Sequence, residues 1–407
     1  MSKAGITKGR LPNKGGLMIF ISTRLSPYYH QMTLEELLFG DDTSKYVVNY
    51  NDTNTRTYAR EHLTYEFRNK YNTYLFWRDA DRLMSEYRDV YECNDLHQFY
   101  DTFYIPKKSK GLRKIDAPIG RLKEAQYKLR DIIEALMTKD SFGREFGATY
   151  HTAAYAYIKG RSPKKCMEKH LRNKSRWFLK LDFSNFFGST TPDFLNNQLM
   201  HIAPFCFIGT EYLSKVMSIA FLDGGLPQGT PLSPLLTNIM MIPIDYELTN
   251  TLRSFEQQSY VYTRYADDIL ITSEYNFSFR KIEEVVKGVL DKYSAPFTIK
   301  PEKTRYGSNA GSNWNLGMMY NADFELTIGH EKKKQFKAML SNYIQDRMHG
   351  NKWDKSDVQV LSGLMSYYTN IEGDKIKEIV NRLSEKYGQD IAAAIKYDLK
   401  QIAQAAY

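Results

Sequence analysis

Two adjacent acidic residues stand inside one of the most apolar stretches of the chain. Asp267 and Asp268 lie between the runs Tyr260–Tyr265 and Ile269–Thr272, a pattern that predicts two strands joined by a tight turn. Unpaired carboxylates are costly among apolar side chains, so a cation should neutralise them. A tight turn can bring both carboxylates to one end of the hairpin, where Mg²⁺ would accept their oxygens. Taken alone, the pair also fits a solvated turn, because Asp is common in turns.

A third acid changes that balance. Asp182 ends the apolar run Trp177–Leu181, so two acidic sites borne by strands can converge on one pocket. Phosphoryl transfer with two metal ions about 3.5–4 Å apart requires several carboxylates to hold the ions. Together, Asp182, Asp267 and Asp268 are sufficient for a two-metal centre.

The elements that must position these acids alternate between strand and helix. Residues 105–115 read as a strand, a basic turn and a returning strand, and apolar residues at helical spacing predict a helix over residues 122–136. A loop rich in Gly and Pro over residues 226–234 leads into an apolar helix, and residues 282–290 predict an amphipathic helix. Beyond Lys332 the pattern predicts helices over residues 357–368, 376–387 and 391–405. The chain is therefore expected to be an α+β protein.

Composition narrows the class of protein. A hydrophobic fraction of 42% and a charged fraction of 25% are typical of a folded globular chain of 407 residues. The net charge of +9 favours a polyanionic partner. The three cysteines lie far apart, without the spacing of a zinc site or a disulfide framework, which fits a reducing compartment. The early apolar run Leu17–Ile21 is far shorter than the roughly 18 residues of a membrane span, so a cytoplasmic protein without membrane contact is expected.

Five motifs in order resemble those of bacterial reverse transcriptases, over about residues 100–320. They are Ile105-Pro106-Lys107-Lys108 through Arg113, Leu181-Asp182, Leu226-Pro227-Gln228-Gly229-Thr230-Pro231-Leu232-Ser233-Pro234, Tyr265-Ala266-Asp267-Asp268, and Pro301-Glu302-Lys303-Thr304. Each string alone is a weak to moderate signal, but five in the family's order make a chance likeness improbable. The resemblance implies an RNA-directed DNA polymerase.

The resemblance also implies a right-handed polymerase architecture. Its expected parts are an N-terminal extension of unknown role over residues 1–100, fingers over 101–180, a palm with a fingers insertion over 181–330, and a helical thumb over 331–407. The palm would be a sheet backed by helices that holds the acids.

Roles at the reaction centre follow from the same resemblance. Asp182, Asp267 and Asp268 would hold two Mg²⁺ ions, with Mn²⁺ as an alternative, and the backbone carbonyl of Phe183 would be a further ligand. Lys303 resembles the lysine proposed to protonate the pyrophosphate leaving group.

Other residues would bind the incoming nucleotide. Arg113 with Lys107 or Lys108 would grip the triphosphate, where fixed positive charge offsets the charge that builds up during transfer. Phe187 would stack under the sugar and leave no space for a 2′-hydroxyl, which implies deoxynucleotide substrates. Gln228 would contact the sugar and the template side. The alternatives are a solvated basic turn, a core phenylalanine and an ordinary surface lysine at Lys303.

The sequence indicates the subfamily less clearly than the family. Retron enzymes carry an Asn-Ala-x-x-His element and a Val-Thr-Gly element, and the corresponding places here match only at His170 and Gly317. Size and the remaining motifs resemble a retron-like or stand-alone phage-defence enzyme. Its expected partners are a small non-coding RNA as template, a DNA primer or product, and deoxynucleoside triphosphates. A second copy or an accessory defence protein is a further expected kind of partner.

Four other functions share part of this pattern. They are a template-independent or protein-primed DNA-synthesising defence enzyme, a group II intron-like reverse transcriptase, an RNA-dependent RNA polymerase, and a non-catalytic RNA-binding scaffold. Phe187 argues against the RNA polymerase, because that family usually has a small or acidic residue there. The intact acids argue against the scaffold.

Overall fold

The computed structural model describes residues 72–107, 111–138, 150–257, 259–310, 315–321 and 323–404. The described residues fall into two compact units from an interleaved chain: those before 139 with 190–240 form the first, and those of 150–189 with 241–404 form the second. These units divide the chain differently from the linear fingers and palm boundaries expected above. Among the described residues, no helix is both long and apolar enough to cross a membrane.

The first unit combines helices with one two-stranded hairpin. Residues 72–86 are helical. The further elements are α3 (Arg88–Tyr91), η2 (Leu96–Phe99), β1 (Tyr100–Pro106), β2 (Leu112–Pro118), α4 (Gly120–Thr138), α6 (Pro192–Leu199), η3 (Phe205–Phe207), α7 (Thr210–Met217), η4 (Ser218–Ala220) and α8 (Ser233–Met240). The apolar stripe that predicted a helix over 122–136 is buried along α4. The expected strand, turn and returning strand form the antiparallel pair β1–β2.

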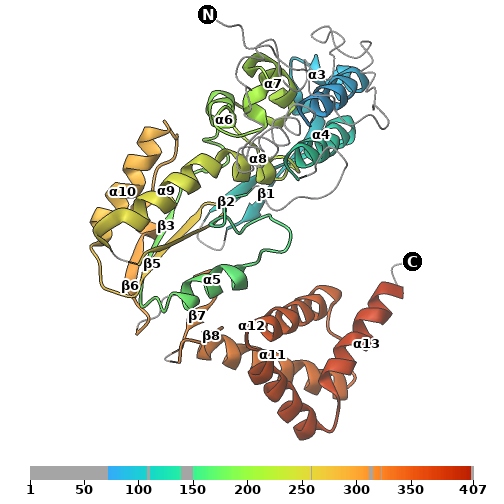
Figure 1. Ribbon diagram of the computed structural model, residues 1–407. Coiled ribbons are helices and arrows are strands. Elements are labelled where there is room, and N and C mark those ends of the chain that lie inside the picture. The colour runs from blue at the N-terminus through green and yellow to red at the C-terminus, as the bar shows by residue number, and fades with distance from the viewer. Residues whose placement is uncertain are drawn as a thin grey trace, which may run out of the picture. The chain divides into compact units, whose positions relative to one another are not determined.

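The second unit is built on a four-stranded antiparallel sheet in the order β4-β5-β3-β6 (Figure 1). Its strands are β3 (Trp177–Asp182), β4 (Val261–Tyr265), β5 (Asp268–Ser273), β6 (Arg305–Ser308) and a separate pair β7 (Met319–Tyr320) and β8 (Leu326–Thr327). Its helices are α5 (Pro163–Arg172), α9 (Ile242–Ser254), η5 (Phe255–Gln257), α10 (Phe279–Lys292), η6 (Pro301–Lys303), α11 (His330–Met348), α12 (Lys355–Tyr387) and α13 (Ile391–Gln404).

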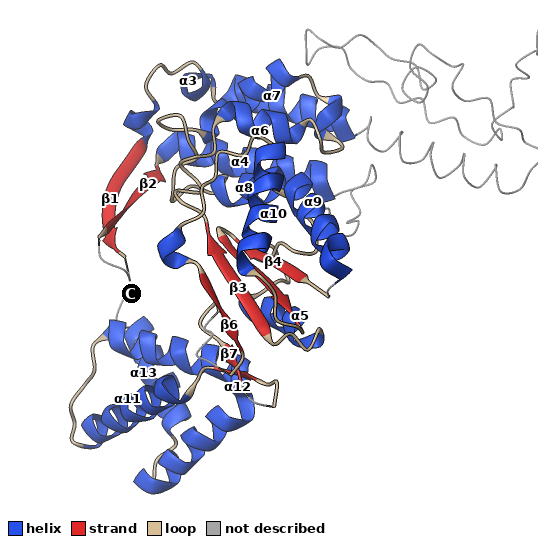
Figure 2. Cartoon of the chain, turned by 90° about the vertical axis from the view of Figure 1, so that its left-hand side faces the viewer, coloured by secondary structure: helices blue, strands red, loops and turns tan. Residues whose placement is uncertain are grey.

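Helices cover both faces of this sheet (Figures 1 and 2). On one face, Tyr262 of β4 donates a hydrogen bond to Asp245 of α9, and α10 packs against α9 with Ile282 and Val286 buried at helical spacing. On the other face, α5 is joined to the sheet through buried His170. The prediction of a palm-like layer, a sheet backed by helices, is confirmed.

The C-terminal helices share a core with the sheet. A single cluster of buried apolar residues runs from Phe178 on β3 and Leu270 on β5 to α11, α12 and α13. Helices were expected over residues 357–368 and 376–387, and α12 covers both ranges with a kink between them, where the backbone of Glu372 is non-helical (φ -127°, ψ 58°). Helix α12 ends at Gly388, whose left-handed backbone (φ 63°) is the usual helix terminator.

Candidate active site

The three acids predicted to act together lie at one end of the sheet. Asp182 is the last residue of β3 and is directly paired with Asp268, the first residue of β5. Directly opposed residues of antiparallel strands carry their side chains on the same face. Tyr265 pairs with Asp268, so Asp267 lies in the two-residue loop between β4 and β5. The strand register therefore brings the carboxylates together.

The acidic loop has a constrained backbone. Ala266, the first loop residue, has a φ of 57°, in the left-handed region that two-residue hairpin loops require. For a residue with a Cβ this conformation costs about 1–2 kcal/mol. The N–H of Phe183 donates a hydrogen bond of 3.2 Å to the carbonyl of Asp267, which ties the loop to the residue that follows β3.

Lysine side chains bind two of the three acids. The ammonium groups of Lys300 and Lys303 lie 2.7 Å and 2.9 Å from the carboxylate of Asp182, and Lys180 lies 3.0 Å from that of Asp268. Lys303 was among the expected site residues, whereas Lys300 and Lys180 were not. Lys180 precedes Asp182 by two residues on the same strand face, and Lys300 precedes Lys303 by one helical turn, so both spacings carried a signal.

The pKa values of Asp182 and Asp267 are shifted in opposite directions. Burial tends to raise the pKa of Asp182, but hydrogen bonds from Lys300 and Lys303 outweigh it and hold that pKa below its ordinary value. Burial raises the pKa of Asp267, and the neighbouring charges of Asp268 and Asp182 raise it further. Asp267 is thus the acid whose charge is least compensated.

An aromatic cluster follows Asp182. The side chains of Phe183 and Phe186 are buried and contact Phe297, while the half-buried ring of Phe187 lies edge-on to that of Phe186. Phe186 therefore belongs to the core, and Phe187 is the more accessible ring.

The expected triphosphate-binding residues belong to the first unit. Arg113 lies on β2 opposite Ile105 and is exposed. Lys107 is exposed, and its N–H donates to the carbonyl of Gly111, which closes the hairpin. Lys108 lies outside the described residues.

The Pro-Gln-Gly loop is fitted against the same hairpin. The carbonyl of Gln228 accepts a hydrogen bond of 2.8 Å from the N–H of Asp116 on β2. The hydroxyl of Ser233 donates to the carbonyl of Pro227 and closes the loop at the start of α8. The backbone of half-buried Gln228 is thereby held against β2. Its side-chain amide takes no part in this hydrogen bond.

His170, one of two matches to the retron elements, is a structural residue. Its side chain is fully buried, and its two ring nitrogens lie 2.7 Å from the hydroxyls of Thr272 and Thr263. Burial lowers the pKa of His170 to about 3, so the ring is neutral at physiological pH. His170 fixes α5 on the sheet face that carries Asp182 and Asp268.

The donor chemistry of the site fits hard divalent cations, although the carboxylates are engaged elsewhere. No group of three or more His, Cys, Asp and Glu side chains among the described residues is arranged to hold a metal ion. The carboxylates of Asp182 and Asp268 instead form ion pairs with Lys300, Lys303 and Lys180. Carboxylate oxygens are nevertheless the ligands that Mg²⁺ prefers, and the raised pKa of Asp267 reflects charge that a cation would compensate.

Comparison with known proteins decides the family. Residues 105–339, more than half of the chain, match the family reverse transcriptase (RNA-dependent DNA polymerase). The chain belongs to the reverse transcriptase family. It is 27% identical to the Retron Ec73 reverse transcriptase of Escherichia coli over 70% of this chain and 86% of that protein, and 27% identical to the Retron Ec83 reverse transcriptase over 73% and 89%. This reverse transcriptase is therefore retron-like, and it is an RNA-directed DNA polymerase.

Solved structures of telomerase are more distant. Telomerase from Candida albicans, in complex with a fragment of telomeric RNA, aligns with a TM-score of 0.43 at 12% identity over 78% of this chain and 59% of that chain. The family assignment rests on the sequence match alone.

Proposed function

We propose that this reverse transcriptase transfers nucleotides by a two-metal mechanism centred on Asp182, Asp267 and Asp268. The observation that carries the proposal is the register of β3 and β5, which pairs Asp182 with Asp268 and puts Asp267 in the adjoining loop. Two bound Mg²⁺ ions would activate the attacking hydroxyl and stabilise the leaving oxygens. The carbonyl of Phe183 would complete the oxygen ligands.

The lysines beside Asp182 have two separable tasks in this proposal. Lys303 has a side chain that is 46% exposed, which leaves it free to swing to the leaving pyrophosphate and donate a proton. Lys300 is 24% exposed and would remain near Asp182 as a fixed positive charge. Burial tends to lower the pKa of Lys303, but its hydrogen bond to Asp182 raises it overall, which keeps the proton on the amine until transfer.

Substrate selection would depend on five further residues. Lys107, Lys108 and Arg113 would contact the triphosphate, and Gln228 would contact the sugar. Phe187 would exclude the 2′-hydroxyl, which makes deoxynucleoside triphosphates the substrates. We also propose that residues 101–180 form the fingers, residues 181–330 the palm with a fingers insertion, and residues 331–407 the helical thumb.

For the biological role we propose copying of a small structured RNA in bacterial antiviral defence. The support is the likeness to retron reverse transcriptases and the net charge of +9, which favours a polyanionic partner. Sequencing the RNA that co-purifies with the chain, together with the DNA it makes, tests this role. Product complementary to the bound RNA is expected. A product unrelated to any bound RNA would instead identify template-independent or protein-primed synthesis.

Substitution of the acids tests the chemistry. Asp267→Asn and Asp268→Asn are each expected to lower deoxynucleotide incorporation by about 1,000-fold or more, because an amide is a poor ligand for a hard cation. Glu284→Gln on the exposed face of α10 is the matched control and should leave the rate unchanged. Retained incorporation in both Asp variants would refute the proposed centre.

The sugar preference has a separate test. Phe187→Ala is expected to raise incorporation of ribonucleotides relative to deoxynucleotides by about 10-fold or more, because it removes the ring that would exclude the 2′-hydroxyl. Phe207→Ala is the control, since this ring is 51% exposed and lies in the other unit. An unchanged preference in Phe187→Ala would contradict the assigned role of Phe187.

A further inference from the structure

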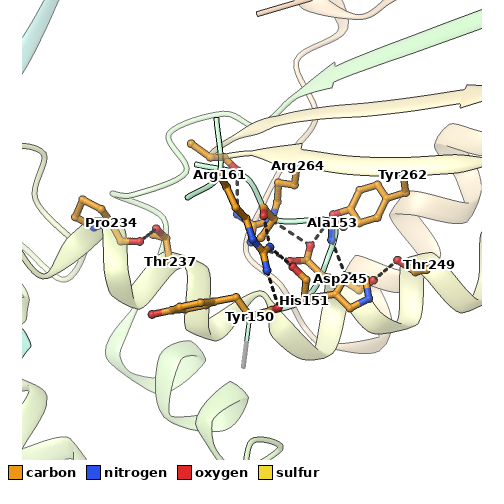
Figure 3. Close-up of polar contacts among 12 residues, drawn as sticks. Tyr150, His151, Ala153, Arg161, Pro234, Thr237, Asp245, Thr249, Tyr262 and Arg264 are labelled. Atoms are coloured by element: carbon orange, nitrogen blue, oxygen red, sulfur yellow. Dashed lines mark hydrogen bonds and ion pairs between the residues drawn. The ribbon is translucent and has the colours of Figure 1, made fainter. Parts of the chain in front are cut away.

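Behind the acidic loop lies a fully buried ion pair. Arg264 of β4 and Asp245 of α9 are both 0% exposed, and the guanidinium binds both carboxylate oxygens, at 3.0 Å and 2.9 Å (Figure 3). The hydroxyl of Tyr262 donates a third hydrogen bond, of 2.6 Å, to the same carboxylate. Arg264 thus has its side chain fixed on the α9 face of the sheet, opposite to the face that carries Asp268.

The same guanidinium also reaches the acidic loop. Nη1 of Arg264 donates a hydrogen bond of 3.2 Å to the carbonyl of Ala266, the residue with left-handed backbone. The next carbonyl, that of Asp267, accepts from the N–H of Phe183. Each carbonyl of the two-residue loop therefore accepts a hydrogen bond, that of Ala266 from Arg264 and that of Asp267 from Phe183.

The backbone of Arg264 is fixed as firmly as its side chain. Its N–H donates to the carbonyl of Ala153 at 2.7 Å, and its carbonyl accepts from the N–H of Tyr155 at 2.9 Å. Arg161 in turn donates to the carbonyl of His151 (Figure 3). It also donates to the carbonyl of Ala154, so it joins two residues of this segment. Arg264 is thus held by hydrogen bonds at both its backbone and its side chain.

A buried ion pair is a poor device for stability alone. Removing two charges from water is costly, and well-packed apolar residues of similar volume often stabilise a fold as well or better. An apolar pair could not, however, donate a hydrogen bond to Ala266. Arginine is suited to the double task, because its planar group has five donors and stays charged when buried.

We propose that Arg264 is a positioning residue for the polymerase reaction, with Asp245 holding its guanidinium so that it sets the place of Asp267 and Asp268. The proposal rests on the proposed function of those two acids. It assigns to the Asp245–Arg264 pair a role in the rate of transfer that is separate from its role in folding.

Three changes separate the two roles. Asp245→Leu combined with Arg264→Met removes both charges while keeping apolar volume. Arg264→Lys keeps the charge but loses the bidentate contact with Asp245 and the hydrogen bond to the carbonyl of Ala266. Tyr262→Phe removes one hydrogen bond to Asp245 and leaves the contact with Ala266 in place.

The measurements are the urea midpoint, kcat and KM for deoxynucleotide, and the dissociation constant for a primer–template duplex by fluorescence anisotropy. Both Arg264 variants should lose about 100-fold in kcat, because small misplacement of reacting groups has effects of that size. Duplex affinity should stay within about twofold of the wild type, since the pair is buried. Tyr262→Phe should lower the urea midpoint and keep kcat within about twofold.

The opposite pattern would overturn the proposal. Wild-type kcat in folded Arg264→Lys or in the double variant, or a loss of kcat that follows the urea midpoint across all three changes, would make the pair purely structural. Glu247→Gln combined with Lys292→Gln removes the more exposed ion pair between α9 and α10 and is the matched control. Should Asp267→Asn and Asp268→Asn both retain activity, the proposed function fails instead, whatever the Arg264 variants do.

Discussion

Gly229 has no room for a side chain. Its φ is 115°, and a Cβ at this position would lie 2.8 Å from Cγ2 of Ile115 and 3.1 Å from the carbonyl oxygen of Asp116. The loop that carries Gln228 can therefore lie against β2 only if the next residue is glycine.

Gly229→Ala is expected to destabilise the chain by about 2 kcal/mol or more, from strained backbone and overlap with Ile115. The overlap would push the loop away from β2 and displace Gln228, so KM for deoxynucleotide should rise as well. Chemical denaturation and steady-state kinetics are the measurements.

Gly288→Ala is the matched control. It lies within α10 with no atom near the position of a Cβ, so the change should stabilise the chain by about 1 kcal/mol through helix propensity. Equal effects of the two substitutions would contradict the role assigned to Gly229.

Single residues also show how far the sequence could predict the site. Asp182, Asp267 and Asp268 lie together, because strand ends and a tight turn leave few arrangements, and Lys303 lies beside Asp182, as the resemblance implied. Arg264 and Asp245 were not predicted. Their roles depend on which residue of another element lies opposite, and local pattern does not contain that information.

At the scale of elements, α5 depends on a hydrogen-bond relay through its buried histidine. Thr272 donates to Ser175 and so accepts from Nδ1 of His170, which leaves Nε2 to accept from Thr263. Cys166 donates to Thr263 and completes the relay. This arrangement requires a neutral ring.

The stabilisation from His170 should therefore depend on pH. Its pKa is lowered to about 3 in the fold and is ordinary, about 6.5, in the unfolded chain. Below pH 6.5 the unfolded state takes up a proton that the folded state refuses, so this stabilisation is complete above that pH and falls by about 1.4 kcal/mol per pH unit towards pH 3.

The check is a comparison of wild type with His170→Asn by urea denaturation at several pH values. The wild type should be more stable at pH 7.5, and its advantage should shrink between pH 6 and pH 4. A constant difference over that range would show that the pKa of His170 is not lowered. His349→Gln, at an exposed position near the end of α11, is the control.

The elements themselves were largely predictable, with boundaries shifted by a few residues. The strands beside Asp267 and Asp268 and the helices α4 and α10 follow from apolar periodicity. The two helices expected over residues 357–387 meet at a kink in α12, at Glu372. The contacts at this kink were not predictable, because buried Glu372 is bound by Lys333 and by the N–H of Ile328, which belong to other parts of the chain.

At the scale of the whole molecule, the second unit unites segments that are far apart in sequence. Phe178 and Leu270 on the sheet belong to the same buried cluster as α11, α12 and α13. Leu179, the next residue on β3, is buried on the opposite face. The two faces of one strand should therefore report on different sets of helices.

Phe178→Ala is expected to cost about 3–5 kcal/mol and to speed amide hydrogen exchange in α11, α12 and α13. Leu179→Ala, of comparable cost, should speed exchange in α9 and α10 instead. Mass spectrometry of peptic fragments distinguishes the two patterns. The same pattern for both substitutions would show that the cluster does not couple the sheet face selectively to the C-terminal helices.

That shared cluster also sets a rule for exchanging parts between related enzymes. A cut before α11 would separate the C-terminal helices from the sheet residues against which they pack, and a donor's helices would meet a foreign surface at Phe178 and Leu270. A chimaera that transfers these helices should therefore carry the matching residues of β3, β5, β7 and β8 with them. The part that can be exchanged consists of the C-terminal helices together with the strand residues that contact them. Because these residues come from several segments, no single position in the sequence bounds it.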